Sequence, residues 1–486
     1  MRKGAMPMKV LSFQGKVFYP LLCNPGVTGE LERHTLVNQK GRTVNIFRKE
    51  AFSVEEMRPG LGALLSGGES SVASIYYFNR REAVNLPREG QKALLHTRSG
   101  SQIPLALGRV GFVVFQTGVC FLEMDVSLEE QALETVMEAA YYLCEVKDRS
   151  NALSYEEVTF DAAAKTKRTD LKTVSIKDLF LDCIRFLGPC SHFEDKPLEA
   201  MTAKPLLYSY YFLESAPENP GALAENIAQN YKLSYKGLEG GKHSLYTFQN
   251  SAWCVSANGA GNLSWQVEDP ATNDFFRTTF VHKWRSEYLF LFLNVIHQKY
   301  AVLKSLGEFA ESVSLEQSYD ALKQELLISE VMQERCERLK MRCFFDMPSR
   351  VDHVNRVYRF FQQSMEVPRY LAGLNRKLQE SVNVCKSYTS RIKEIDDLQR
   401  DIHSAQTEIK IALLTACVTC LTFFNSFYAT LLHLLRREFG EIGVDAIILT
   451  ATFLATILGV ILNVANKRDT IQELRRKIAR AQKKLY

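Results

Sequence analysis

Sequence motifs for catalysis are missing from this chain of 486 residues. There is no H-E-x-x-H zinc motif and no G-x-S-x-G nucleophile motif, and the nine histidines are scattered. Neither of two glycine clusters is followed by the Gly-Lys-Ser or Gly-Lys-Thr of a phosphate loop. We therefore predict no catalytic residue, no metal ligand and no permanently bound cofactor. A membrane-tethered enzyme is the least favoured function.

The chain also has little excess charge. Its net charge is +5, and segment 467–486 alone holds eight basic and two acidic residues, so the remainder is close to neutral. This balance gives no reason to expect a direct nucleic-acid partner. The eleven cysteines are odd in number and scattered, which argues against a disulfide framework. The basic N-terminal stretch has no apolar core behind it, so it does not predict a signal peptide.

Long apolar runs are present instead, close to the C-terminus. Segments 409–435 and 444–464 are each about as long as the roughly 20 residues that a helix needs to cross a bilayer. The first carries no charged residue after Lys410, and the second carries none after Asp445. We predict a two-span transmembrane hairpin over residues 409–466, with a buried pair of soluble helices as the alternative.

The charges that flank these two spans predict their orientation. The basic segment 467–486 directly follows the second span, and an excess of Lys and Arg beside a span marks the cytoplasmic side. Arg436 and Arg437, in the turn between the spans, argue in the opposite direction but are outnumbered. We expect a multi-pass protein of the inner (cell) membrane with both termini in the cytoplasm.

Hydroxyl side chains recur along the first span. They are spaced by three or four residues, so they share one face of a helix. Hydroxyls on such a face have a function in a membrane span if they contact water or neighbouring helices. Two interpretations stay open: this face lines a pore in a homo-oligomer, or it forms a packing seam of small residues. The predicted pore-lining residues are Thr415, Thr419, Thr422, Ser426 and Thr430.

The N-terminal segment 1–160 has the pattern of an α/β domain. Short apolar runs alternate with turn signals, among them Gly15 and the hairpin turn at Gln116-Thr117. Ser127, with a glutamate three residues later, has the spacing of a capping box before a predicted helix over residues 128–144. Strands followed by a helix in this order suggest a split βαβ unit.

A second region of similar composition follows this domain. Segment 162–172 is polar and basic, so we expect a linker there. Segment 173–273 then shows an amphipathic helix over residues 174–187 and an aromatic strand over residues 205–213. This region is either a second α/β lobe or a continuation of the first sheet.

One glycine cluster in this region is a candidate ligand site. Residues 258–262 read Asn-Gly-Ala-Gly-Asn and follow two predicted strands. Backbone N–H groups, two amide side chains and two indole rings could together hold the base and phosphate of a nucleotide. A plain turn is the alternative, both here and for a second cluster at residues 65–71. The predicted ligand-binding residues are Trp253, Asn258, Gly259, Gly261, Asn262 and Trp265.

Helical patterns dominate from residue 274 onward. Segment 274–408 has breaks near Pro348 and Pro368, and a stalk helix over residues 369–408 carries apolar residues at the spacing of a coiled-coil seam. Neither Pro nor Gly interrupts residues 374–435, so we predict one helix of about 60 residues, roughly 90 Å long, that continues into the first span. The expected fold class is an α+β cytoplasmic domain, then long antiparallel helices, then the transmembrane hairpin.

This layout resembles the CorA family of divalent-cation channels. Residues 421–428 read Leu-Thr-Phe-Phe-Asn-Ser-Phe-Tyr and are similar to the Leu-Thr-Phe…Tyr run at the end of that family's first span. The family continues with Gly-Met-Asn, which holds hydrated Mg²⁺, where this chain has Ala429-Thr430-Leu431. The resemblance implies a homo-oligomer, which is a pentamer in that family. One function that it implies is a divalent metal cation (Mg²⁺) transporter.

The CorA-like scaffold, the lost mouth motif and the enlarged N-terminal domain together resemble the CorA-like effectors associated with type III CRISPR systems. That resemblance implies a ligand-gated membrane pore in antiviral defence. It also implies a nucleotide second messenger, such as S-adenosylmethionine joined to AMP, as the opening ligand. The implied partners are the lipid bilayer, further copies of the chain and this small nucleotide, with Mg²⁺ as a candidate permeant ion.

Overall fold

The structure is a computed structural model of the chain. It describes residues 8–24, 26–37, 42–51, 57–58, 61, 71–161, 166–191, 201, 203–234, 244–312, 319–435 and 442–483. The chain divides into two compact units. The first comprises Met1–Ala310 and Gln333–Arg376, and the second comprises Glu311–Met332 and Lys377–Tyr486.

The first unit is built around one large sheet, which has 13 strands within the described residues. These are β1 (Lys9–Cys23), β4 (Phe47–Glu50), β5 (Ala73–Phe78), β6 (Gln91–His96), β7 (Gln102–Phe115), β8 (Val119–Ala132), β9 (Ala152–Asp161), β10 (Thr166–Ser175), β11 (Cys190–Ser191), β12 (Leu206–Leu213), β13 (Ser244–Phe248), β14 (Ser251–Ser256) and β15 (Gly259–Trp265). The main path runs β10-β9-β6-β7-β8-β1-β12-β15-β14-β13, with β5 on β7, β4 on β5 and β11 on β1. The β12–β15 pair is parallel, and the other pairs of the path are antiparallel. Strands β2 (Thr35–Val37) and β3 (Thr43–Asn45) form a separate pair.

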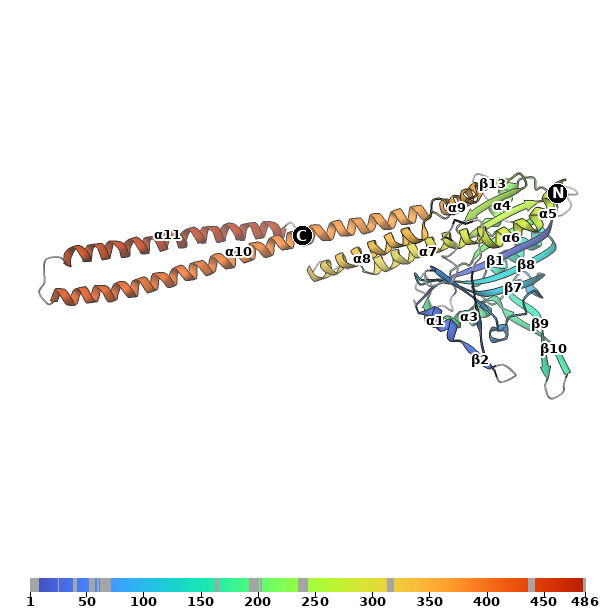
Figure 1. Cartoon of the computed structure of the whole chain (residues 1–486), viewed down its shortest axis with the longest axis horizontal. Coiled ribbons are helices and arrows are strands. Elements are labelled where there is room, and N and C mark those ends of the chain that lie inside the picture. The colour runs from blue at the N-terminus through green and yellow to red at the C-terminus, as the bar shows by residue number, and fades with distance from the viewer. Residues whose placement is uncertain are drawn as a thin grey trace. The chain divides into compact units, whose positions relative to one another are not determined.

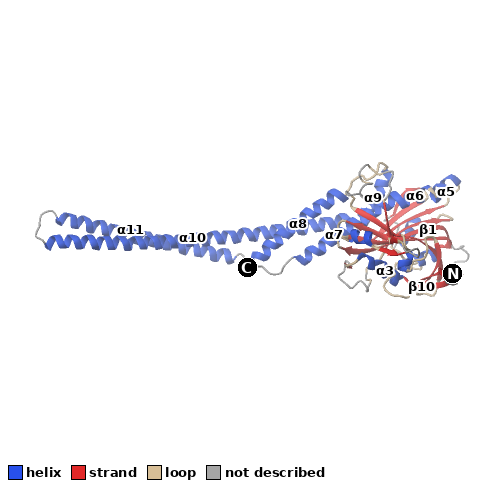
Figure 2. Cartoon of the chain, turned by 60° about the horizontal axis from the view of Figure 1, so that its bottom comes forward, coloured by secondary structure: helices blue, strands red, loops and turns tan. Residues whose placement is uncertain are grey.

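Helices cover both faces of this sheet. The helical segments of this part of the chain are α1 (Val27–Arg33), η2 (Arg81–Val84), α2 (Leu133–Leu143), α3 (Ile176–Ile184), η3 (Arg185–Leu187), α4 (Pro220–Ala228), α5 (Pro270–Arg277), α6 (Thr279–Lys283), η5 (Trp284–Tyr288), α7 (Leu289–Ser312) and α9 (Asp352–Ser364). On one face, α2, α3 and α4 share an apolar core with the strands. On the other face, the rings of Phe18 and Tyr208 pack on Phe292 of α7. Figure 2 shows α3 and α9 on opposite sides of the strands.

The central strand β1 is one element where the sequence predicted two. It runs unbroken from Lys9 to Cys23 through Gly15, which is not a turn. A Cβ at Gly15 would lie 2.8 Å from the ring of Phe13, so glycine serves close packing within the sheet. The strand pairs along its length with β8 and β12, and both of its faces are covered, which explains the continuous apolar run over residues 17–23.

Two further predictions in this unit were wrong. Ser127 does not cap a helix, because β8 continues to Ala132 and α2 begins only at Leu133. The strand pairing of Ser127 with Gln14 of β1 overrides the local capping-box signal. The predicted linker is largely strand β10, which forms a hairpin with β9; residues 162–165 lie outside the described part.

Other predictions for this unit are confirmed. The predicted turn at Gln116-Thr117 joins β7 and β8 and includes Gly118 as a third residue, since β8 begins at Val119; Val114 pairs with Cys120 across it. The amphipathic helix is α3, and the aromatic strand is β12. Strands β12 to β15 extend the first sheet, so the second of the two interpretations of segment 173–273 holds.

Long helices form the second unit and lead into it from the first. They are α8 (Tyr319–Cys343), α10 (Val367–Leu435) and α11 (Ile442–Lys483). Helix α10 has 69 residues without interruption, as the absence of Pro and Gly predicted, and is therefore roughly 100 Å long at 1.5 Å per residue. Pro368 stands in its first turn, where proline is tolerated. The predicted break near Pro348 separates α8 from α9.

The predicted seam of α10 packs in part against α8. Leu378, Val382 and Cys385 are buried, and the Ser381 hydroxyl lies 3.0 Å from that of Ser329 on α8. Farther along, α10 and α11 run side by side in opposite directions (Figure 1). The basic segment after the second span is therefore a continuation of α11 as far as Lys483.

Candidate functional site

Within the part of the chain that the structure describes, two helices are long and apolar enough to cross a membrane. They lie within α10, over Val367–Ala429, and within α11, over Ile447–Ala481. No residue in the most apolar 18-residue window of either helix is buried. A helix in a soluble core would bury such a window, so these surfaces require a lipid or protein neighbour. The predicted turn over residues 436–443 lies largely outside the described residues.

The two apolar helices contact each other through an aromatic pair and an ion pair. The ring of Phe423 on α10 stacks on that of Phe453 on α11, with centroids 4.0 Å apart and planes 17° from parallel. Lys467 Nζ lies 2.5 Å from a carboxylate oxygen of Glu408. Apolar side chains on the remaining surface point away from this contact, and Leu421 is 70% exposed.

The hydroxyls of the predicted stripe bond within α10. Thr415 Oγ1 donates to the carbonyl of Ile411 at 2.9 Å, and Thr419 Oγ1 donates to that of Thr415 at the same distance. Thr422 bonds the carbonyls of Val418 and Thr419 in the same way. These bonds satisfy the hydroxyl protons and leave oxygen lone pairs on the surface of the helix.

The stripe does not pack fully against α11. Thr419 is half-buried, whereas Thr415, Thr422 and Ser426 are exposed. The side chain of Thr430 lies outside the described part of the chain. A packing seam within one chain therefore does not account for the exposed hydroxyls, and either a pore or a contact between copies of the chain would.

The two predicted indole platforms are part of the core. Trp253, on β14, is fully buried, and its ring centroid lies 5.0 Å from that of Tyr288 and 5.4 Å from that of Phe361. Trp265 ends β15 and is 7% exposed. Because neither ring presents an open face, the structure does not support their predicted contact with a base.

The glycines of the same cluster serve close packing of the backbone. Gly259 has a φ of +144°, and a Cβ there would lie 1.9 Å from the carbonyl oxygen of Leu207 on the parallel strand. A Cβ on Gly261 would lie 2.5 Å from Cγ2 of Ile227 on α4. These contacts favour the alternative interpretation, a plain turn between β14 and β15.

The two asparagines are likewise bonded inside the fold. The Asn258 amide donates to the carbonyl of Gln229 at 3.0 Å. Asn262 is fully buried, and its amide donates to Ser251 Oγ at 3.0 Å while its oxygen accepts from Ser264 Oγ at 2.9 Å. Of the second glycine cluster, residues 65–70 lie outside the described part of the chain.

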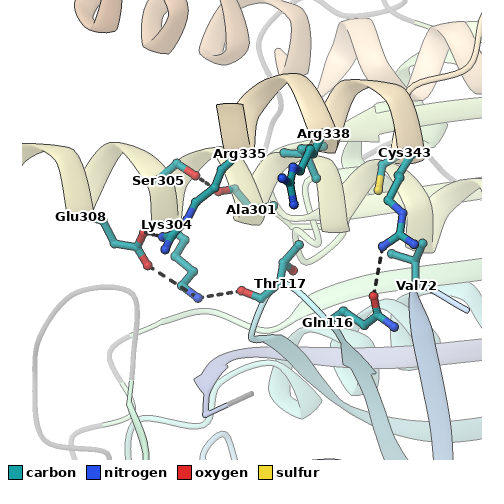
Figure 3. A pocket seen from close by; sticks show the side chains of 12 residues that line it. Val72, Gln116, Thr117, Ala301, Lys304, Ser305, Glu308, Arg335, Arg338 and Cys343 are labelled. Atoms are coloured by element: carbon teal, nitrogen blue, oxygen red, sulfur yellow. Dashed lines mark hydrogen bonds and ion pairs between the residues drawn. The ribbon is translucent and has the colours of Figure 1, made fainter. Parts of the chain in front are cut away.

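A pocket that the sequence patterns did not predict lies between α7, α8 and the β7–β8 turn (Figure 3). We call it the basic pocket; its cavity measures about 380 Å³. Its lining combines four basic side chains, one acidic side chain and a group of buried apolar side chains. The lining residues are Val72, Gln116, Thr117, Ala301, Lys304, Ser305, Glu308, Arg335, Arg338, Leu339, Arg342 and Cys343.

Lys304 is the most firmly placed of the basic side chains. It extends from α7 to the β7–β8 turn, where Nζ donates to the carbonyl of Thr117 at 2.6 Å (Figure 3). Glu308 lies 3.6 Å from Lys304 Nζ and 3.6 Å from Arg335 Nη1, so one carboxylate faces two cations.

The other arginines come from one face of α8. Arg335, Arg338 and Arg342 are spaced by three and four residues, which is the signal that sequence reasoning missed. Arg338 is 2.6 Å from Glu334, and Arg342 donates to the side-chain oxygen of Gln116 at 3.2 Å.

A second charged group, on the sheet itself, is internally compensated. Lys16 Nζ lies 2.5 Å from Glu123 and 2.5 Å from Asp125. Burial opposes the charged form of Lys16, but the two carboxylates outweigh it and hold its pKa above the usual value. Arg109 lies 3.6 Å from Asp125 and 4.6 Å from the Tyr77 ring centroid. Lys16, Arg109 and Asp125 line a cavity of about 410 Å³. Both of these cations lie beside a carboxylate, Lys16 beside Glu123 and Asp125 and Arg109 beside Asp125.

Within the described residues, no group of three or more His, Cys, Asp or Glu side chains could hold a metal ion. Comparison of the chain with protein families, curated proteins and solved structures finds no match.

Proposed function

We propose that the chain forms a homo-oligomeric, ligand-gated pore in the inner (cell) membrane. The observation that carries this proposal is the exposure of the apolar windows of α10 and α11. Two paired helices of this length and composition satisfy their own backbone hydrogen bonds, which a membrane requires. Lipid would cover Leu421 and its exposed apolar neighbours, with both termini in the cytoplasm.

The hydroxyl stripe of α10 lines the proposed pore. Its exposed members, Thr415, Thr422 and Ser426, are polar enough to meet water and neutral enough to sit within a span. Two helices from a single chain enclose no channel, so several copies must surround a common axis. The pentamer implied by the CorA resemblance is the working expectation for their number.

Gating follows from the continuity of α10. This one helix begins next to α9 in the first unit and contains the first apolar window. A regular helix is stiff over its length, so a rotation or tilt at its first turns is carried to the span. A small nucleotide bound by the first unit would cause that rotation or tilt, as the resemblance to CRISPR-associated effectors implies. Opening of the pore would harm the membrane of an infected cell.

Ion efflux from liposomes that contain the purified full-length protein tests the proposal. Efflux that needs an added nucleotide supports the gated pore and identifies the ligand class. Flux that is constant and selective for Mg²⁺ would replace the proposal by the divalent-cation transporter, which the run of residues 421–428 favours. No flux under any condition would contradict both and favour a contact seam with a tethering role. Empty liposomes with the same nucleotides are the control.

A further inference from the structure

We propose that the basic pocket binds a soluble phosphate ester that carries at least two negative charges and an apolar portion. A nucleoside diphosphate has this chemistry. The proposed site is independent of the predicted cradle around Trp253, and its role in gating rests on the function proposed above. Binding itself can be tested whether or not the protein conducts ions.

The charge balance of the pocket calls for an anion. Its lining holds four cations, Lys304, Arg335, Arg338 and Arg342, against the single carboxylate of Glu308. Glu334 outside the lining pairs with Arg338, which leaves four positive and two negative charges. Like charges three and four residues apart on a helix destabilise it. A ligand with two negative charges would balance this group.

The cations have donors available for such a ligand. A guanidinium carries five N–H donors, and its planar geometry matches two phosphate oxygens at once. Arg335 Nη1 lies 3.6 Å from a carboxylate oxygen of Glu308, which is longer than a hydrogen bond. Arg342 contacts the neutral amide of Gln116. Both guanidiniums therefore keep most of their donors for an oxyanion.

Lys304 provides a fixed positive point at the turn. Its side chain is 25% exposed, and the Thr117 carbonyl holds its ammonium group in place. The neighbouring Gly118 has a φ of +80°, and a Cβ there would lie 2.7 Å from Lys304 Nζ. Glycine at this position therefore lets the lysine approach the backbone of the turn.

The buried apolar residues of the lining, which we call the floor of the pocket, are the reason that the proposed ligand has an apolar portion. Val72, Ala301, Leu339 and Cys343 line it, and each is at least nine-tenths buried. The volume of about 380 Å³ lies in the range of small-molecule sites. A free inorganic anion would contact the basic rim and leave this floor uncovered, whereas a nucleoside could cover it.

The position of the pocket suggests how occupancy would act. Its lining joins the β7–β8 turn to α7 and α8, three elements that contribute Thr117, Lys304 and Arg338 respectively. A phosphate bonded to cations from both helices would fix α7 against α8. In the proposed pore, the fixing of α7 against α8 is the step of gating that depends on the ligand.

Isothermal titration calorimetry of the full-length protein in detergent tests the site with ADP and with pyrophosphate. We expect ADP to bind at least about tenfold more tightly than pyrophosphate, because the nucleoside also covers the apolar floor. The Arg335→Gln/Arg342→Gln variant should weaken ADP binding about tenfold or more. Glu308→Gln should strengthen it several-fold, because it removes the one negative charge of the lining.

Arg149→Gln is the matched control, since Arg149 is an exposed arginine of the first unit with one carboxylate partner. Its binding of ADP should equal that of the unchanged protein. The opposite effects expected of the arginine and Glu308 variants exclude general unfolding as the cause.

Absence of ADP binding, or equal affinity for ADP in all variants, would overturn the site. Equal affinity for ADP and pyrophosphate would overturn the role of the floor. Binding without efflux would leave the site standing and remove the pore.

Discussion

The imidazole of His297 lies flat on the ring of Phe115, with centroids 3.9 Å apart and planes 5° from parallel. This contact joins α7 to the end of β7, one turn of helix from the basic pocket. His297 Nε2 is 2.9 Å from Thr117 Oγ1, and Nδ1 is buried with no hydrogen-bond partner among the described residues. Burial lowers the pKa of His297 to about 3, so the ring is neutral in the fold.

The first unit should therefore lose stability as the pH falls below 6.5. In the unfolded chain His297 takes up a proton near its usual pKa of 6.5, whereas in the fold it stays neutral down to about 3. Over that window protonation favours the unfolded state by about 1.4 kcal/mol per pH unit. Replacing His297 by Gln, which keeps an amide near Thr117, should make the pH dependence shallower by this amount.

Tryptophan fluorescence can monitor this unfolding selectively. The chain has three tryptophans, at positions 253, 265 and 284, and all lie in the first unit. Guanidinium titrations at pH 7 and pH 5 should show a smaller loss of unfolding free energy for His297→Gln than for the unchanged protein. Equal losses would show that His297 is protonated in the fold.

The ion cluster of the sheet gives a second prediction. Lys16 and Glu123 are both almost completely buried, and Lys16→Met would leave the carboxylate without its nearest cation. Removal of one partner of a buried pair costs about 3–5 kcal/mol. The double variant Lys16→Met/Glu123→Gln should recover part of this loss in the same fluorescence titration. Arg369→Met, which breaks the exposed pair with Glu366, should cost at most about 1 kcal/mol. A loss of at most about 1 kcal/mol for Lys16→Met would contradict the stabilising role of the buried pair between Lys16 and Glu123.

Local sequence signals predicted the helices well, and the reason is physical. Helix α10 depends on hydrogen bonds four residues apart, so the absence of Pro and Gly over residues 374–435 was sufficient to predict its continuity. The β7–β8 hairpin depends on a short local turn over residues 116–118, so its existence was predictable from adjacent residues. The apolar windows follow from composition alone.

Contacts distant in sequence explain what local signals missed. Ser127 has a helix-cap pattern, but pairing with Gln14 makes it part of a strand. The role of Gly259 depends on Leu207, which belongs to another strand. The basic pocket combines a strand turn with two helices, so its cations come together only in the fold. The spacing of three arginines on α8 was visible in the sequence, but the facing Lys304 was not predictable.

The backbone contact of Gly259 can be tested directly. Gly259→Ala would place a Cβ 1.9 Å from the Leu207 carbonyl at a φ of +144°, so we expect a loss of roughly 3 kcal/mol or more in the unfolding free energy. Gly307→Ala is the control, because nothing lies within 4 Å of a Cβ there and the position is helical. It should be neutral or stabilising by up to about 1 kcal/mol. A stable Gly259→Ala protein that lost nucleotide binding would instead revive the predicted cradle.

Substitutions in the hydroxyl stripe of α10 distinguish a pore lining from a contact seam between copies of the chain. Thr419→Leu/Thr422→Leu should lower ligand-dependent efflux from liposomes about tenfold or more, because an apolar ring in a narrow pore excludes water. The variant loses only hydroxyls that bond within the helix, so α10 itself should remain intact.

Thr452→Leu is the matched control for this stripe, since its hydroxyl also bonds within the helix, to the carbonyl of Ile448 at 2.8 Å, but it lies on α11. Its efflux should remain close to that of the unchanged protein. A seam would respond differently: the α10 variant would alter the assembly of the oligomer in detergent, seen as a change in its mass. Unchanged efflux and an unchanged oligomer together would remove both roles from the stripe, and the exposed hydroxyls would then face lipid.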